Sequence, residues 1–442
     1  MKIKISDYIA NFFAKKKMLQ IFGITGGGAM HLNNSFAKNK NLDFIFFHHE
    51  QSAAMAADAY YRKNQRPCVL HTTSGPGATN AITGVTGAWI DSIPMFVISG
   101  QVSTKDMIRH TKTRQIGVQE INIIDIVKPI TKFSATIDDP EQIDIYLNKS
   151  YHSMFDSRPG PVWLDVPLDV QSKLIDTKKI KKFTKKNKNK KNKNTIVKTL
   201  EKNIIKSSRP IIVIGNGIHI SKSERLFRIF LDKLNIPVIS SWNASDIINS
   251  SHNLYVGRMG IFGDRASNFA IEGADLIIVL GSRLSVPQTG YKTKVFAQKV
   301  KKIIIDISRS ELNKNKFSKV ILKHQSDLNV FLKIANKYFE GRKTELEISS
   351  LAEERFHAVL ATVTTSVSLE LFLLGVPTIV YLDGNNFNLS PLRDEIGTNF
   401  VSCSRELNSV LMSSLPRQPM KTIGDTFWTD PAIPKWHSLL DY

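Results

Sequence analysis

Residues 43–62, DFIFFHHEQSAAMAADAYYR, decide the fold of the first part of this chain. The stretch starts with a short apolar run typical of a buried strand and ends in an alanine-rich segment typical of a helix. Glu50 stands where the strand passes into the helix, directly after His48 and His49. Because the helix dipole favours an acid in the first turn, Glu50 can be an ordinary helix-start residue on this stretch alone.

Strand and helix patterns alternate on both sides of this stretch. Strands are predicted at 19–25, 42–47, 66–73, 93–100 and 160–167, and helices fall between them. Apolar strands that alternate with helices indicate a mostly parallel sheet with helices on both faces. Such sheets bind ligands at the carboxyl ends of their strands. ITGGG, HHE, TTSGPG and SGQ all stand at predicted strand ends.

The positive charge of the chain is concentrated in one segment. The formal net charge of the 442 residues is +21, which invites a nucleic-acid interpretation. Residues 178–194, KKIKKFTKKNKNKKNKN, hold ten lysines and no acid, and such low-complexity runs are usually solvated linkers. The run shows no interleaving of arginine with aromatic residues. We therefore expect a linker and no nucleic-acid partner, and a polyanion contact is the alternative.

Cysteine usage and hydropathy bear on the compartment. Cys68 and Cys403 cannot build a disulfide framework and are consistent with a reducing cytoplasm. No segment approaches the roughly 18 continuous apolar residues of a membrane span, and the first residues lack a signal-peptide cleavage pattern. These features predict a cytoplasmic chain without a membrane partner.

A second α/β unit follows the lysine-rich run, with apolar strands within 209–218, 236–242, 274–285 and 301–308. Its glycine turn, GNGIHI, lacks the spacing of the dinucleotide fingerprint. Asp306 is interpreted as a strand-end cap, and ribose binding is the alternative. We predict two successive doubly wound parallel-sheet domains, 1–172 and 196–340, joined by a Lys/Asn-rich linker at 173–195 and followed by a small partial α/β segment at 350–442.

Five segments follow one another in the first unit: FGITGGGAM, HHEQSAAMAADAYYR, TTSGPGATNAITGVTGAWIDSIPMFVISGQV, RQIGVQEINIIDIVKPITK and RPGPVWLDVPLDVQ. The second unit adds RPIIVIGNGI, GRMGIFGD, ADLIIVLGSRLS and KKIIIDISRSELNKN. In this order they resemble the thiamine-diphosphate-dependent enzymes of the acetolactate synthase type. The resemblance implies a pyrimidine-binding domain at 1–172 and a central domain at 196–340.

The resemblance gives Glu50 a chemical role. Thiamine diphosphate must lose a proton from its thiazolium C2, and a carboxylate hydrogen-bonded to N1′ of the aminopyrimidine promotes the tautomer that accepts it. Such a carboxylate works best when it is poorly solvated and fixed by its scaffold. Glu50 matches this glutamate. The small residues after it are expected to let the helix pack closely: Ser52, Ala53, Ala54, Ala56 and Ala57.

The same resemblance places further residues around the cofactor. Gln119 matches a residue near the substrate channel, so the implied catalytic residues are Glu50 and Gln119. His49 is expected to support Glu50, and neither His48 nor His49 is expected to bind a metal ion. Asn80 is expected to organise the cavity. The implied cofactor-binding residues are Thr25, Gly26, Gly27, Glu50, Thr73, Ser74, Gly77 and Asn80.

Two cofactors remain to be placed. Enzymes of this type hold the diphosphate through Mg²⁺ in a third domain, whose Gly-Asp-Gly and later Asn supply oxygen ligands. YLDGNNFN, with Asp383, does not match that signature. No metal ligand is therefore assigned, and Mg²⁺ is expected to come with a partner domain in a homo- or hetero-oligomer. FAD binds the central domain of true acetolactate synthases, but GSRLSVPQTG lacks an acid after Arg283. A central domain without FAD is preferred, and FAD is the alternative.

The C-terminal segment resembles another family. TTSVSLELFLLGVPTIVY is similar to the nucleotide-sugar half of surface-polysaccharide glycosyltransferases of the GT-B fold, which would place Glu370 and the turn at 375–377 toward the donor. A structural cap is the preferred interpretation of this segment. The join near 340–350 suggests a fusion of two gene fragments.

Taken together, the sequence predicts an enzyme that decarboxylates a 2-keto acid and transfers the two-carbon unit, without its diphosphate-binding domain. The alternatives are a catalytically inactive truncated fusion, a partner-binding module, or a glycosyltransferase-like protein of surface-polysaccharide biosynthesis.

Overall fold

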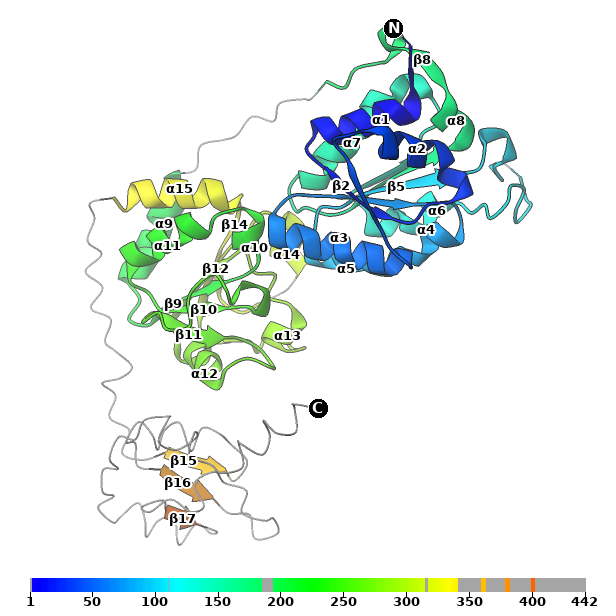
Figure 1. Cartoon of the computed structure of the whole chain (residues 1–442). Helices are drawn as coiled ribbons and strands as arrows, with labels where there is room; N and C mark the ends of the chain where they lie inside the picture. The colour runs from blue at the N-terminus through cyan, green and yellow to red at the C-terminus, as the bar shows by residue number, and fades with distance from the viewer. Residues whose placement is uncertain are drawn as a thin grey trace.

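The computed structural model describes residues 2–109, 111–184, 194–314 and 317–340, together with three short strands at 359–362, 378–381 and 399–401. Figure 1 shows two α/β domains, the first in blue to cyan and the second in green to yellow. The first domain contains a six-stranded, all-parallel sheet in the order β3-β2-β4-β5-β7-β6. Its strands are β2 (Gln20–Gly23), β3 (Asp43–Phe46), β4 (Val69–Thr72), β5 (Phe96–Gln101), β6 (Phe133–Thr136) and β7 (Val162–Pro167).

Helices cover both faces of this sheet. Alternate strand residues enter two separate apolar clusters, so each face has its own core. One core is completed by α1 (Ile5–Lys15), α2 (Met30–Lys38), α7 (Ile143–Phe155) and α8 (Leu168–Ser172). The other is completed by α3 (Glu50–Asn64), α4 (Pro76–Asn80), α5 (Ile82–Asp91) and α6 (Ile123–Val127).

A two-stranded antiparallel ribbon closes the first domain. β1 (Lys2–Lys4) pairs with β8 (Leu174–Asp176), which lies within the range assigned from the sequence to the linker. The start of the chain and the exit toward the lysine-rich run therefore lie side by side, as Figure 1 shows next to the label N.

The second domain repeats the same architecture. Its all-parallel sheet has the order β11-β10-β9-β12-β13-β14. The strands are β9 (Pro210–Ile214), β10 (Val238–Ser240), β11 (Tyr255–Arg258), β12 (Leu276–Leu280), β13 (Lys301–Asp306) and β14 (Val320–Gln325). On one face lie α9 (Asn194–Ile205), α10 (Gly217–Ile220), α11 (Glu224–Leu234) and α15 (Leu328–Tyr338); on the other lie α12 (Arg265–Gly273) and α14 (Arg309–Lys314). The short helix α13 is Val286–Thr289.

The prediction of two doubly wound parallel-sheet domains is confirmed. The differences fall at the sheet edges, where one face or one side of a strand meets solvent. β6, β11 and β14 are edge strands that the apolar pattern did not reveal. The strand predicted at 42–47 is present as β3, but the prediction that it is buried is wrong. β3 forms the other edge of the first sheet, and Phe46 is 67% exposed.

Each sheet reverses its strand order once. In the first sheet the chain passes from β2 to β3 on one side and then to β4 on the other, so β2 and β4 flank the reversal. In the second sheet β9 and β12 flank it. Ligand sites of doubly wound folds lie at such points, beyond the carboxyl ends of the two strands.

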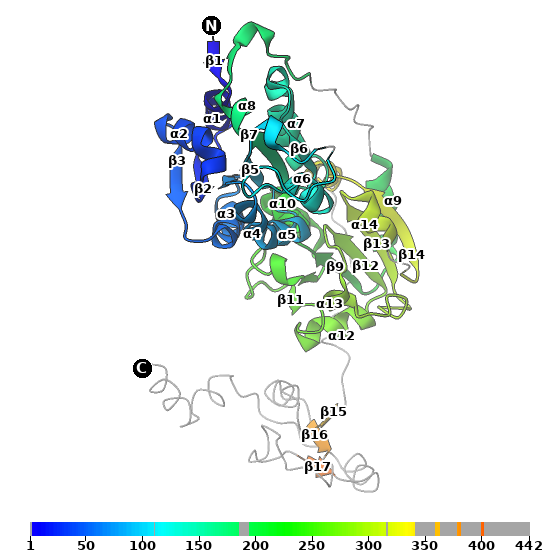
Figure 2. The ribbon, with the colours of Figure 1, turned by 90° about the vertical axis from the view of Figure 1, so that its right-hand side faces the viewer.

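The helix that begins at Glu50 packs very closely against α5, and both Figure 1 and Figure 2 show the two helices side by side. Ala53, Ala54 and Ala57 are buried at this contact, whereas Ser52 is exposed and takes no part in it. A Cβ at Gly84 of α5 would lie 2.5 Å from the Cβ of Ala54. Small residues on both helices therefore set the distance between them.

The C-terminal segment contributes three short parallel strands, β15 (Val359–Thr362), β16 (Thr378–Tyr381) and β17 (Asn399–Val401). Glu370, the turn at 375–377 and Asp383 lie outside the described residues. Across the described parts of the chain, none of the helices has both the length and the apolar character that crossing a bilayer requires.

We predict that Gly84→Ala lowers the free energy of unfolding of the first domain by about 1–3 kcal/mol, because its new Cβ overpacks the contact with Ala54. Gly87→Ala in the same helix is the matched control. A Cβ there meets no atom within 4 Å, so the helix should gain about 0.5–1 kcal/mol. Urea denaturation followed by circular dichroism measures both. Equal effects of the two changes would contradict the packing argument.

Candidate functional site

Two backbone turns meet where the strand order of the first sheet reverses. The turn after β2 leads into the 3-10 helix η1 (Gly27–Ala29), and the turn after β4 leads into α4. A Cβ at Gly26 would lie 2.5 Å from the Cβ of Thr73, so a larger residue at position 26 would push the turns apart. A Cβ at Gly27, in contrast, meets no atom within 4 Å and faces open space.

Glu50 is held at this junction by the end of β3 and the start of α3. His49 caps the helix, since its Nδ1 accepts a hydrogen bond from the backbone N–H of Gln51 at 3.1 Å. The supporting role expected of His49 is thus a helix cap, and His48 is exposed. The Glu50 side chain is only 7% exposed, although it is the first residue of the helix.

The carboxylate of Glu50 is fixed from one side. Asn80 at the end of α4 donates from Nδ2 to Glu50 Oε2 at 3.0 Å. Glu50 Oε1 accepts no hydrogen bond from the described residues, and a Cβ at Gly77 would lie 3.0 Å from it. A helix-start role explains the position of Glu50 in the chain. It explains neither the burial of the carboxylate nor the bond from Asn80.

Gln119 reaches the same junction through its backbone. Gly75, with φ 59°, lies so close to Gln119 that a Cβ there would be 1.9 Å from the Gln119 carbonyl oxygen. Gln119 itself has φ 57°, and its side chain is exposed. The loop after β5 therefore lies against the turn after β4.

The remaining predicted residues lie at the same end of the sheet. Thr25 is exposed in the turn after β2, Thr73 is half-buried and Ser74 is buried after β4. A Cβ at Gly28 would lie 2.6 Å from Ser74 Oγ, so this turn too approaches the neighbouring one closely. The structure thus brings the predicted cofactor-binding residues together, and their roles stay predictions.

Several polar residues that support the site escaped the sequence analysis. His71 of β4 is fully buried, and burial lowers its pKa to about 4. Its Nε2 lies 2.7 Å from Asn33 Oδ1, and Asn33 Nδ2 donates to the Gly26 carbonyl at 3.3 Å. A second buried set comprises Ser99, Gln101 and Asp165. The available signal was a polar letter within each apolar strand: VLHT, FVISGQ and VWLDVP.

The residues present fit the aminopyrimidine of thiamine diphosphate. A ring nitrogen needs one buried, oriented carboxylate oxygen, and Glu50 Oε1 meets that need. A flat ring needs space without side chains, and glycines border it at Gly27 and Gly77. Among the described residues, no three His, Cys, Asp or Glu side chains are grouped so as to bind a metal ion.

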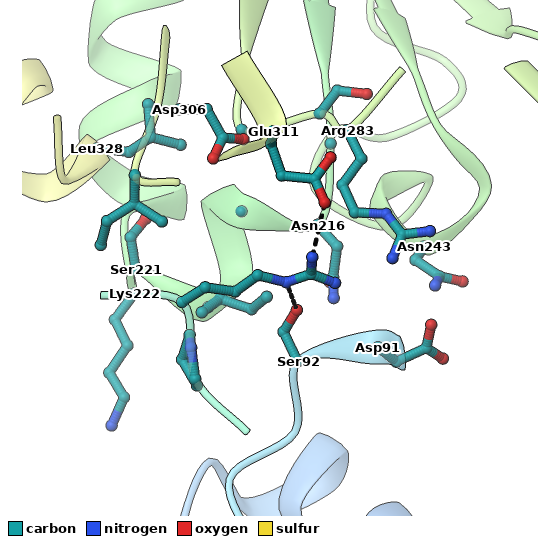
Figure 3. Close-up of a pocket in the computed structure, with 18 of the residues that line it drawn as sticks. Asp91, Ser92, Asn216, Ser221, Lys222, Asn243, Arg283, Asp306, Glu311 and Leu328 are labelled. Atoms are coloured by element: carbon teal, nitrogen blue, oxygen red, sulfur yellow. Dashed lines mark hydrogen bonds and ion pairs between the residues drawn. The ribbon is translucent and has the colours of Figure 1, made fainter. Parts of the chain in front are cut away.

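A separate cavity of about 810 Å³ lies where β9 and β12 flank the reversal of the second sheet. Both domains line it, as Figure 3 shows with Asp91 and Ser92 facing Asn216, Arg283 and Glu311. The Arg158 side chain connects the two domains at this cavity. It donates to Ser92 Oγ at 2.6 Å, to the Ile90 carbonyl at 2.7 Å and to Glu311 Oε1 at 2.7 Å.

Three charged residues that line this cavity, Arg158, Arg283 and Asp306, already have hydrogen-bond partners within the protein. Burial lowers the pKa of Arg158, and the neighbouring Arg283 adds to that effect. Arg283 Nη1 donates to the Ile90 carbonyl at 2.9 Å. Asp306 Oδ1 accepts from the Ser308 N–H at 2.8 Å, as a strand-end cap does, and burial raises the pKa of Asp306. The cavity is therefore a domain junction held by an ion pair.

Sequence comparisons agree with both domains. Residues 3–123 match the family described as "Thiamine pyrophosphate enzyme, N-terminal TPP binding domain". Residues 197–333 match the family described as "Thiamine pyrophosphate enzyme, central domain".

Similar curated proteins carry the name acetolactate synthase. The large subunit from Cyanidium caldarium is 31% identical over 344 residues, which cover 74% of this chain and 56% of that protein. The large subunit from Lactococcus lactis is 33% identical over 298 residues, with 66% and 50% covered. The isozyme 1 large subunit from Escherichia coli is 29% identical over 325 residues, with 73% and 56% covered.

The chain spans about half the length of the curated relatives that it matches. The two segments matched by the family models lie within the two doubly wound domains, one in each, and the candidate site lies in the first domain. Residues 3–123 and 197–333 thus belong to the N-terminal and central domains of the thiamine pyrophosphate enzymes.

Proposed function

We propose that this chain supplies the pyrimidine half of a thiamine-diphosphate site that decarboxylates a 2-keto acid and transfers the two-carbon unit. One observation carries the proposal. The buried carboxylate of Glu50 is fixed through Oε2 by Asn80 and has no described partner at Oε1. It lies against Gly77, in one of the two glycine turns that meet at the reversal of the sheet.

The chain's own residues then have distinct tasks. When bound, thiamine diphosphate supplies a carbon nucleophile after its C2 proton has left. Glu50 holds the shared proton at N1′ of the aminopyrimidine, and burial keeps solvent from weakening that bond. Asn80 fixes the rotation of the carboxylate. Gln119 lies at the rim of the site, where it can meet the keto acid.

The diphosphate and Mg²⁺ need oxygen ligands, and among the described residues no three His, Cys, Asp or Glu side chains are grouped so as to bind a metal ion. We infer that a different subunit brings these ligands, so the active assembly is a hetero-oligomer. Exposed apolar side chains border the site on three elements: Met30 at 51%, Phe46 at 67% and Val118 at 83%. Apolar rims of this kind mark protein contacts. The matched relatives are themselves named as large subunits.

An inactive fusion, a partner-binding module and a glycosyltransferase-like protein are the other outcomes of the tests below. The glycosyltransferase resemblance depends on residues outside the described parts of the chain, and it stays a prediction.

We predict that the isolated chain does not bind thiamine diphosphate with Mg²⁺ tightly. The pyrimidine half offers one hydrogen-bonded carboxylate and ring contacts, and it leaves the diphosphate charge unpaired. Isothermal titration calorimetry of the full chain measures the affinity. Saturable, Mg²⁺-dependent binding at micromolar concentration would show that the chain holds the diphosphate by itself.

In a mixture with a subunit that supplies the diphosphate domain, Glu50→Gln should lower keto-acid turnover by at least about a hundredfold. The amide keeps the shape of the side chain and can still accept from Asn80, so the fold should persist. Glu141→Gln, an exposed glutamate in the same domain, is the matched control. Turnover by the Glu50 variant at the control's rate would remove Glu50 from the proposed role.

We expect the purified chain to carry no FAD, because Arg158 and Arg283 are already bonded across the domain junction and are not available to a pyrophosphate. Visible flavin absorbance after incubation with FAD and gel filtration measures retention. Glu311→Gln removes the charge opposite Arg158 and is the matched variant. Stoichiometric flavin in the unaltered chain would contradict the expectation.

A further inference from the structure

A carboxylate lies buried within the first sheet, away from Glu50. Asp165 of β7 is 1% exposed. Ser99 of β5 donates from Oγ to Asp165 Oδ1 at 2.6 Å, and Gln101 of β5 donates from Nε2 to Asp165 Oδ2 at 3.0 Å. Trp163 Nε1 donates to Ser99 Oγ at 2.8 Å. The strand ladder already joins β5 to β7, so these side chains do something other than pair the strands.

Gln101 uses its whole amide group at this point. Its Nε2 also donates to the Ile121 carbonyl at 3.0 Å, and its Oε1 accepts from the Val102 N–H at 2.9 Å. Val102 and Ile121 are the two ends of the loop that carries Gln119. The Gln101 side chain therefore binds the backbone of the loop at both its first and its last residue.

Asp165 anchors the Gln101 amide to β7. The NH₂ group of Gln101 faces Asp165 and Ile121, and its oxygen faces Val102. The Val102 N–H and the Ile121 carbonyl set the orientation of the amide, and the bond to Asp165 holds it in place relative to the sheet. Losing a buried hydrogen-bond partner is costly, so the position of Gln101 depends on Asp165.

Hydrogen bonds and close packing connect the described residues of this loop to one another. The Glu120 carboxylate accepts from the backbone N–H groups of Ile116 and Gly117, both at 3.3 Å, and also from that of Ile108. A Cβ at Gly117 would lie 2.7 Å from Val102, so the loop packs on its own first residue. Near the end of the loop, the Gln119 carbonyl lies against Gly75 in the turn after β4.

We propose that Asp165, acting through Gln101, is the positioning residue that holds the Gln119 loop (residues 102–121) against the turn after β4. The proposal deepens the proposed function, on which it rests only for the meaning of the loop as the substrate side of the site. Asp165 touches neither the cofactor space nor the rim, and its effect is transmitted by hydrogen bonds.

The charge state of Asp165 gives the proposal a distinctive signature. Burial raises the pKa of Asp165 to about 7, against the hydrogen bonds from Ser99 and Gln101. Arg109 of the loop lowers this pKa, and Asp138 after β6 raises it; these two groups pair with each other at 2.5 Å. A proton on Asp165 can sit on Oδ1, which faces Ser99, so Oδ2 still accepts from Gln101 but as a neutral group, whose hydrogen bonds are weaker. The loop should therefore loosen as the pH falls through about 7.

Hydrogen–deuterium exchange of the full chain on either side of pH 7, corrected for intrinsic exchange, tests the proposal. In the unaltered chain the peptides of the Gln119 loop should lose protection on the acid side. Asp165→Ala should raise their exchange at both pH values by roughly tenfold, the factor that corresponds to about 1.4 kcal/mol.

Asp165→Asn is the decisive variant, because it folds with the same shape. Its Oδ1 can accept from Gln101 as a neutral group while its Nδ2 faces Ser99 Oγ, so the loop should show at both pH values the protection that the unaltered chain has on the acid side, and it should lose its pH dependence. Asp144→Asn, a carboxylate of the same domain that serves Tyr8 and Phe183, is the matched control and should change nothing in the loop.

Protonation of Asp165 affects the stability of the fold with the opposite sign to its effect on the loop, and this provides a second readout. Because the folded pKa is raised, the stabilising contribution of protonated Asp165 is lost as the pH rises from about 4 to about 7. The denaturation midpoint of the unaltered chain should fall relative to that of Asp165→Asn across this range.

Unchanged loop exchange in Asp165→Ala, or a pH dependence that survives in Asp165→Asn, would overturn the proposal. Neither readout involves thiamine diphosphate or a keto acid. Failure of the proposed function would therefore leave this result standing, and the reverse also holds.

Discussion

The candidate site depends on one constraint, the approach of two backbone turns at the reversal of a parallel sheet. The turns after β2 and β4 come within contact distance because Gly26 and Gly28 place no side chain between them. That approach brings α4 close to the start of α3, so that Asn80 can reach Glu50. The burial and orientation of the carboxylate follow from it. The second sheet uses the same device, since a Cβ at Gly215 would lie 2.4 Å from the Gly281 carbonyl oxygen.

The points where the two sheets reverse their strand order nevertheless differ in what lies beside them. In the first domain the turns leave space beside Gly27 and an oxygen of Glu50 without a described partner. In the second domain the equivalent position is crossed by Arg158 from the other domain, which forms an ion pair with Glu311. An open junction suits a reactive ligand, and a bridged junction suits the fixing of one domain on another. The same fold thus provides a candidate binding site and a structural joint in one chain.

The inner strands of both sheets could be predicted from the sequence, whereas the edge strands β6, β11 and β14 could not. Continuous apolar runs such as PIIVI and LIIVL belong to inner strands, and they were found. FSAT, YVGR and VILKHQ lie at sheet edges, where solvent permits polar residues, and they were missed. Glu50 was located through the family resemblance of the ordered segments around it. Arg158 and Gln101 were not, because their partners Glu311 and Ile121 are separated from them in sequence and only the fold brings them together.

The β1–β8 ribbon has a consequence for how the first domain relates to the rest of the chain. Lys2 pairs with Asp176 in the ribbon, so the first and last strands of the domain lie next to each other. A unit with adjacent ends can be cut out, inserted into another chain or circularly permuted with little disturbance of its core. Such a unit is transferable between genes without redesign. The same pairing means that tension on the lysine-rich segment acts on the ribbon before it reaches the sheet that carries Glu50.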